Sequence, residues 1–125
     1  MNVNINNVKS YLLKKEITEK ILRQKGRDAV ISKLRDIRFI WDKYRIDKVY
    51  LYGSFADMTF DKYSDIDIAI EPEISFEELL QLFSEINKYI ENEVDVRVLT
   101  ELPFSDKVRR EGIVIYEREN SNTQE

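Results

Sequence analysis

The strictest pattern in the chain is the alternation of aliphatic and acidic residues between Asp65 and Ile70. Isoleucine stands at 66, 68 and 70, and Asp65, Asp67 and Ala69 alternate with it. Successive side chains of a β-strand point to opposite faces, so this segment predicts a strand with one aliphatic face in a core. The other face then carries two carboxylates roughly 7 Å apart, and their repulsion in a half-buried element requires a compensating charge.

Three more segments have the β-branched and aromatic composition of strands, and they are Lys48–Tyr52, Glu93–Leu99 and Ile113–Tyr116. In the segment at 93–99, three valines alternate with Asp95 and Arg97. If this strand lies next to the one at 65–70, Asp95 joins Asp65 and Asp67 at one end of the sheet.

Helices are predicted around these strands. A weakly amphipathic helix spans about 6–24, and Gly26 is expected to interrupt it before a second helix begins at Asp28. Ser75 and Glu78 form a capping box for a third helix, and a short helix at 105–111 ends at Gly112. The expected buried sides are Val30, Leu34, Ile37, Trp41 and Tyr44 in the second helix, and Phe76, Leu79, Leu80, Phe83, Ile86 and Ile90 in the third.

The chain has 125 residues, which is the length of one domain. Its composition excludes several kinds of chemistry. There is no cysteine and no histidine, which excludes disulfides, zinc sites, thiol nucleophiles and imidazole bases. Catalysis would depend on carboxylates, hydroxyls or a bound metal. No apolar run approaches the roughly 20 residues that cross a bilayer and the first residues are polar, so we expect a cytoplasmic protein without a membrane partner.

Charge is divided unevenly along the chain. Up to Lys48 there are 13 Lys and Arg against 6 Asp and Glu, and after it there are 7 against 18. Two solvated surfaces of opposite sign would explain this asymmetry. It also fits a cation site in the acidic part and a basic part that faces an acidic partner or a phosphate chain. Both interpretations stay open.

Carboxylates on neighbouring strands favour a magnesium site. Mg²⁺ is a hard cation that binds carboxylate oxygens and completes its coordination with water and substrate phosphates. Asp65, Asp67 and Asp95 can hold two such ions, an arrangement used for phosphoryl and nucleotidyl transfer. Gly53 and Ser54, between a strand end and a segment that can open a helix, form a candidate phosphate-binding turn. The alternative is that the aspartates face solvent on an open sheet.

Three motifs occur in order, Gly53-Ser54-Phe55-Ala56, Ser64-Asp65-Ile66-Asp67 and Val94-Asp95-Val96, and together they resemble the minimal nucleotidyltransferases of the polymerase-β-like superfamily. The offset of 11 residues from Ser54 to Asp65 is typical of that family. The resemblance covers roughly 28–116. It implies an α+β (α/β) nucleotidyltransferase fold with a small mixed β-sheet flanked by helices. The expected parts are an N-terminal helical extension at 1–27, a nucleotidyltransferase domain at 28–117 and a polar tail at 118–125.

The same resemblance implies a function and its residues. Gly53 and Ser54 would bind the nucleotide, and Asp65, Asp67 and Asp95 would be the catalytic residues and the ligands of two Mg²⁺ ions. ATP would donate AMP to a hydroxyl. Members of this minimal family resemble antitoxins that silence a helical HEPN ribonuclease by attaching AMP to a tyrosine, which implies a HEPN-family toxin as partner. The basic N-terminal helices are a candidate docking surface, direct nucleic-acid binding is not expected, and homo-oligomer formation stays open.

The sequence departs from the family pattern at Asp57-Met58, where Arg-Gly commonly follows the Gly-Ser motif. An anion and a bulky side chain replace a cation and a flexible residue, and Arg97 or Lys62 is a candidate for the missing cation. A catalytically weak or inactive module that neutralises its partner by binding alone is therefore the alternative. A third class is a stand-alone transferase for a small hydroxylated molecule, which predicts a deep acceptor pocket.

Overall fold

The sheet has four strands, and the structure, a computed structural model, describes residues 4–119. The ends at 1–3 and 120–125, which belong to the predicted extension and tail, lie outside the described residues. The strands lie in the order β3-β2-β1-β4, and they are β1 (Lys48–Tyr52), β2 (Ile66–Glu71), β3 (Val94–Val98) and β4 (Ile113–Glu117). β1 pairs antiparallel with β2 and β4, whereas β2 and β3 are parallel. The predicted mixed sheet is confirmed.

A single long helix, α1 (Ile5–Asp36), precedes the sheet. The predicted interruption at Gly26 is wrong, because the helix continues through this residue. Packing explains the glycine: a Cβ atom at Gly26 would lie 3.2 Å from the Phe60 ring. Glycine inside a helix costs about 1 kcal/mol, too little to end a helix whose C-terminal part is packed on a core. The predicted domain boundary between 27 and 28 falls within α1, and no break in the helix marks it.

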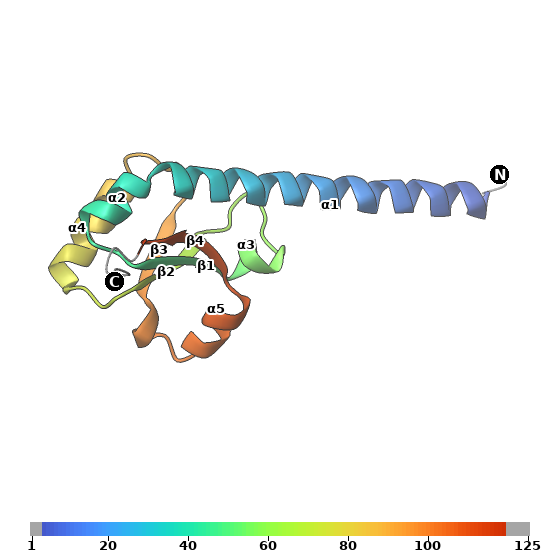
Figure 1. The fold of residues 1–125 in the computed structure, drawn as a ribbon. Helices are drawn as coiled ribbons and strands as arrows, with labels where there is room; N and C mark the ends of the chain where they lie inside the picture. The colour runs from blue at the N-terminus through green and yellow to red at the C-terminus, as the bar shows by residue number, and fades with distance from the viewer. Residues whose placement is uncertain (1–3, 120–125) are drawn as a thin grey trace.

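The N-terminal part of α1 projects away from the rest of the chain (Figure 1), and residues 4–25 are all exposed. From Gly26 onward the helix packs on the sheet. None of the helices within residues 4–119 combines the length and the apolar character needed to cross a bilayer.

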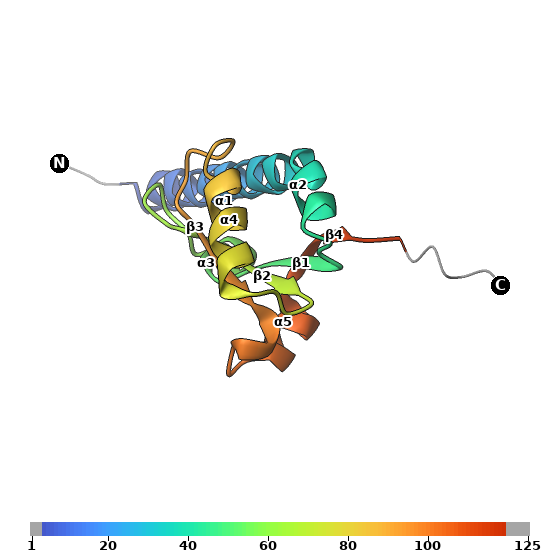
Figure 2. The ribbon, with the colours of Figure 1, turned by 90° about the vertical axis from the view of Figure 1, so that its left-hand side faces the viewer.

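One face of the sheet carries the main core. It is covered by the end of α1, by α2 (Arg38–Lys43) and by α4 (Phe76–Ile86), and Figure 2 shows these three helices on the same side. The predicted stripe lies in this core: Leu34 and Trp41 are fully buried, and the Trp41 indole N–H donates to the Leu34 carbonyl at 3.0 Å. The isoleucines of β2 are fully buried beneath it.

The predicted buried side of α4 is partly wrong. Leu82, which the prediction omits, is fully buried together with Ile86, whereas Phe76, Leu80 and Phe83 are 74%, 51% and 42% exposed. The apolar residues of α4 occupy a wide arc of the helix, and only one edge of that arc contacts the sheet. Helical spacing identifies the arc, but the angle at which the helix docks decides which edge is buried.

The opposite face is covered only in part. The short helices η1 (Leu99–Glu101) and α5 (Ser105–Glu111) lie there, and Figure 2 shows α5 across the sheet from α1. A smaller core joins them to the strands through Tyr50, Ala69, Leu99, Leu102 and Val108.

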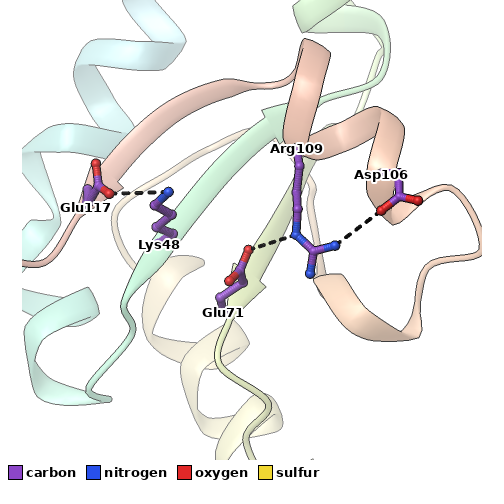
Figure 3. A network of polar contacts seen from close by, with 5 residues as sticks. All are labelled: Lys48, Glu71, Asp106, Arg109 and Glu117. Atoms are coloured by element: carbon purple, nitrogen blue, oxygen red, sulfur yellow. Dashed lines mark hydrogen bonds and ion pairs between the residues drawn. The ribbon is translucent and has the colours of Figure 1, made fainter.

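Ion pairs link α5 to β2, β1 to β4, and two side chains within α5 (Figure 3). Arg109 of α5 lies 3.6 Å from Glu71 and 3.5 Å from Asp106, and Lys48 of β1 lies 3.3 Å from Glu117 of β4. Pairs of this kind contribute about 0–1 kcal/mol, so the buried contacts of the smaller core hold α5 in place.

Candidate active site

Two carboxylates lie side by side on the partly covered face. The parallel register of β2 and β3 places Asp67 directly opposite Asp95, and both side chains are half-buried. On the other side of Asp67, the antiparallel register of β1 places Tyr52, the residue before Gly53. β2 and β3 are therefore neighbours, as the grouping of the predicted aspartates requires.

The turn after β1 is pressed against Asp67. Gly53 has a φ of 71°, in the region that favours glycine, and a Cβ atom there would overlap the Asp67 carboxylate. The helical turn α3 (Ser54–Asp57) begins directly afterwards, with Ser54 half-buried at its first position. The predicted nucleotide-binding pair Gly53-Ser54 and the predicted metal ligand Asp67 thus belong to one compact site.

The electrostatics of this site favour a bound cation. Burial raises the pKa of the Asp67 carboxyl, and the charges of Asp95 and then Asp65 raise it further, while Arg97 acts in the opposite direction. Burial and the same Asp67 and Asp95 charges raise the pKa of the Tyr52 hydroxyl to about 12. Negative charge is therefore concentrated here beyond what Arg97 offsets.

The three predicted ligands are not placed alike. Asp65 precedes β2 and is exposed, and Asp95 Oδ1 accepts a hydrogen bond from Arg97 Nε at 3.0 Å. Within residues 4–119, no three acidic side chains are placed to hold a metal ion as they stand. The donor set nevertheless fits Mg²⁺, because carboxylate oxygens are its preferred protein ligands and the charge around Asp67 lacks full compensation.

Beside Gly53 lies a hollow of about 180 Å³. Tyr52 and Phe104 contribute aromatic walls with ring centroids 5.9 Å apart. Asp57 stands in the wall, and Lys107 of α5 lines the same hollow. Sequence reasoning missed Lys107 as a candidate cation, because 50 residues separate it from Asp57 and only the packing of α5 brings the two together.

The two candidates for the missing cation lie at different places. Arg97 is paired with Asp95 at the carboxylates. Lys62 lines a separate hollow, beside Gly26 and Phe60 on the α1 side. The second departure from the family pattern has a backbone consequence: Met58 has a φ of 64°, a left-handed conformation that favours the glycine commonly found there in the family.

Comparisons with known proteins agree with this fold. The family model described as "Polymerase beta, Nucleotidyltransferase" matches residues 35–121, well over half of the chain. The chain therefore belongs to the polymerase β nucleotidyltransferase family, and the predicted resemblance is confirmed.

A solved structure described as "Crystal structure of the toxin-antitoxin with AMP-PNP" is similar in fold, with a TM-score of 0.56 and 19% sequence identity. The match covers 70% of this chain and 74% of that one. A search among curated proteins gives no match.

Proposed function

We propose that this chain is a magnesium-dependent protein adenylyltransferase that transfers AMP from ATP to a tyrosine hydroxyl of a HEPN-family toxin, and so acts as the cytoplasmic antitoxin of that toxin. The observation that carries the proposal is the parallel register that sets Asp67 beside Asp95, with Gly53 turned against the Asp67 carboxylate. Nucleotidyltransferase chemistry needs this combination of metal-binding carboxylates and a turn that lets phosphates approach the backbone.

The proposed reaction is a displacement at the α-phosphorus of ATP. The tyrosine oxygen forms a bond to this phosphorus, the bond to the α–β bridging oxygen breaks, and pyrophosphate leaves while the hydroxyl proton passes to a carboxylate or to solvent. The Gly53 backbone and the Ser54 hydroxyl would hold phosphate oxygens. Asp65, Asp67 and Asp95 would hold two Mg²⁺ ions, which supply positive charge for the reacting and leaving oxygens.

Two features support the choice of nucleotide and partner. The first is that the similar solved structure is described as a toxin-antitoxin with AMP-PNP, an ATP analogue, which supports an adenine nucleotide and a toxin partner for a chain of this fold. The second feature is the position of Asp67 and Asp95 on the partly covered face of the sheet, where a partner protein can bring its own hydroxyl to the carboxylates.

The test is transfer of label from ATP labelled at the α-phosphate. The full chain is incubated with Mg²⁺ and with the product of the neighbouring gene, and compared with the Asp65→Asn, Asp67→Asn double variant. Asp36→Asn, an exposed aspartate at the end of α1, is the matched control. Label on the partner with the wild type and with Asp36→Asn, but not with the double variant, supports the proposal.

A binding module without activity is the second candidate, favoured by two observations. Asp57 places an anion in the hollow beside Gly53, and Arg97 already occupies Asp95. If this candidate is correct, no label reaches the partner, and both the wild type and the double variant bind it equally tightly.

A further inference from the structure

The projecting part of α1 has an unusual surface for a helix surrounded by solvent. Between Ile5 and Leu22, eight large apolar side chains are each at least 41% exposed: Ile5, Val8, Tyr11, Leu12, Leu13, Ile17, Ile21 and Leu22. At about 100° per residue, Val8, Leu12 and Leu22 lie on one side and Leu13, Ile17 and Ile21 on the opposite side. A second helix packed against it would cover only one of these sides, whereas a groove with two walls can cover both.

The charge of the same segment restricts what can cover it. Residues 5–24 carry five Lys and Arg and two Glu. Two such helices packed against each other would bring like charges together, and this repulsion disfavours self-pairing of the projecting segments. The covering surface is therefore expected to be apolar and acidic.

A surface of that kind lies on the same chain, and we call it the α4–β3 groove. It has a volume of about 360 Å³ and lies between the exposed side of α4 and the edge strand β3. The residues that line it are Asp65, Leu79, Leu80, Phe83, Glu93, Val94, Asp95 and Val96. The segment 73–93, which holds α4 and leads into β3, carries six glutamates and one basic residue, Lys88. Glu93 lines the groove itself, and Glu85 pairs with Lys43 at 2.7 Å. Phe76, at 74% exposed, extends the apolar surface at the start of α4.

We propose that two copies of this chain form a symmetric dimer in which the projecting segment of each, residues 5–24, docks along the α4–β3 groove of the other. Both surfaces are apolar and otherwise uncovered in the described part of the chain, and their charges are opposite. The segment is about 30 Å long, comparable with the diameter of a small domain, so it can reach across a second copy. Exchange of identical contacts about a two-fold axis closes the assembly at two chains.

The dimer would also affect the candidate active site. Asp65 and Asp95 line the groove, so a docked helix would border the carboxylates and restrict the path of any acceptor to the remaining side. This inference does not depend on the proposed transfer of AMP, because it concerns association of the chain with itself.

Sedimentation equilibrium of the full chain tests the dimer with paired charge reversals. The helix variant is Lys14→Glu, Lys15→Glu, Lys20→Glu, and the groove variant is Glu91→Lys, Glu93→Lys; all five side chains are exposed, so the fold should be retained. We expect a wild-type dimer that weakens at high salt, and a dissociation constant at least about tenfold higher for each variant by itself. An equimolar mixture should recover much of the association. In the mixed dimer one contact joins the unchanged helix to the unchanged groove, and in the other the acidic helix meets a groove segment whose net charge has changed from −5 to −1, with four Glu and three Lys.

Several outcomes would overturn the proposal. A wild-type chain that stays monomeric at all concentrations, and associates only with another protein, excludes a second copy as the occupant. A groove variant that dimerises as tightly as the wild type shows that the helices pair without the groove. Circular dichroism of each variant, compared with the wild type, checks that lost association is not lost folding.

Discussion

The same strands form both faces of the sheet, but one face is buried and aliphatic and the other carries half-buried carboxylates. On the face under α1, α2 and α4, Ile66, Ile68 and Ile70 are fully buried among apolar side chains. On the other face, the next residues of the same strands are Asp67 and Asp95, half-buried and close enough to raise the pKa of Asp67. One face therefore stabilises the fold, and the other holds like charges that a bound cation would offset.

The largest effect on stability is expected from the buried face. Ile68→Ala removes a fully buried side chain at the centre of β2 and should lower the free energy of unfolding by about 3–4 kcal/mol. Urea denaturation measures this change. The matched Ile68→Val should cost only about 1 kcal/mol. A loss below about 1 kcal/mol for the alanine variant would mean that this face is less tightly packed than the structure indicates.

A smaller effect is expected where the turn meets the site face. Gly53→Ala forces a side chain into a φ of 71° and against the Asp67 carboxylate, and should cost about 2 kcal/mol and stop nucleotide binding. The double variant Gly53→Ala, Asp67→Ala separates the two causes. It should recover part of the lost stability, since the overlap is removed and only the backbone strain remains. Equal losses with and without Asp67 would contradict the contact.

At Met58, glycine should give a more stable protein than alanine, the reverse of their usual order of stability. Because the residue has a φ of 64°, Met58→Gly should be more stable than Met58→Ala by about 1 kcal/mol. Both variants remove the same side-chain contacts, so their difference in urea denaturation isolates the backbone. If alanine is the more stable of the two, the left-handed conformation is not maintained in solution.

The smallest effect on stability, with a large effect on activity, is expected at Asp67. Burial and the charges of Asp95 and Asp65 make the ionised Asp67 carboxylate unfavourable in the folded chain. With magnesium chelated, Asp67→Asn should therefore leave the free energy of unfolding within about 0.5 kcal/mol of the wild-type value, or raise it. The proposed transfer of AMP should fall by about 100-fold or more. A marked loss of stability would show that Asp67 serves the fold and would remove the contrast between the faces.

Local pattern was enough to predict most of the secondary structure. The strands begin and end within about one residue of the predicted segments, since alternation depends only on neighbouring side chains. Ser75 was correctly predicted to cap α4, and its hydroxyl accepts from the Glu78 N–H at 3.1 Å.

The wrong predictions concern positions whose structure depends on packing against distant parts of the chain. Gly26 did not end α1, because the C-terminal part of the helix packs on the core and this outweighs the cost of a glycine; the glycine itself lies where a Cβ atom would come within 3.2 Å of the Phe60 ring. The buried edge of α4 was misassigned because the docking angle selected Leu82 over Phe83. Both positions lie in helices. There the sequence shows the spacing of apolar residues, but it does not show which side of the helix will face the sheet.

The sequence by itself determined which residues share a face, and hence that Asp67 and Asp95 each lie opposite an aliphatic core, because side-chain direction in a strand is a property of the local backbone. Only the tertiary structure decided that β2 and β3 are parallel neighbours in a register that sets Asp67 beside Asp95, and that Lys107 shares a hollow with Asp57. Those arrangements depend on how α4 and α5 pack on the sheet, and no local pattern records the outcome of that packing.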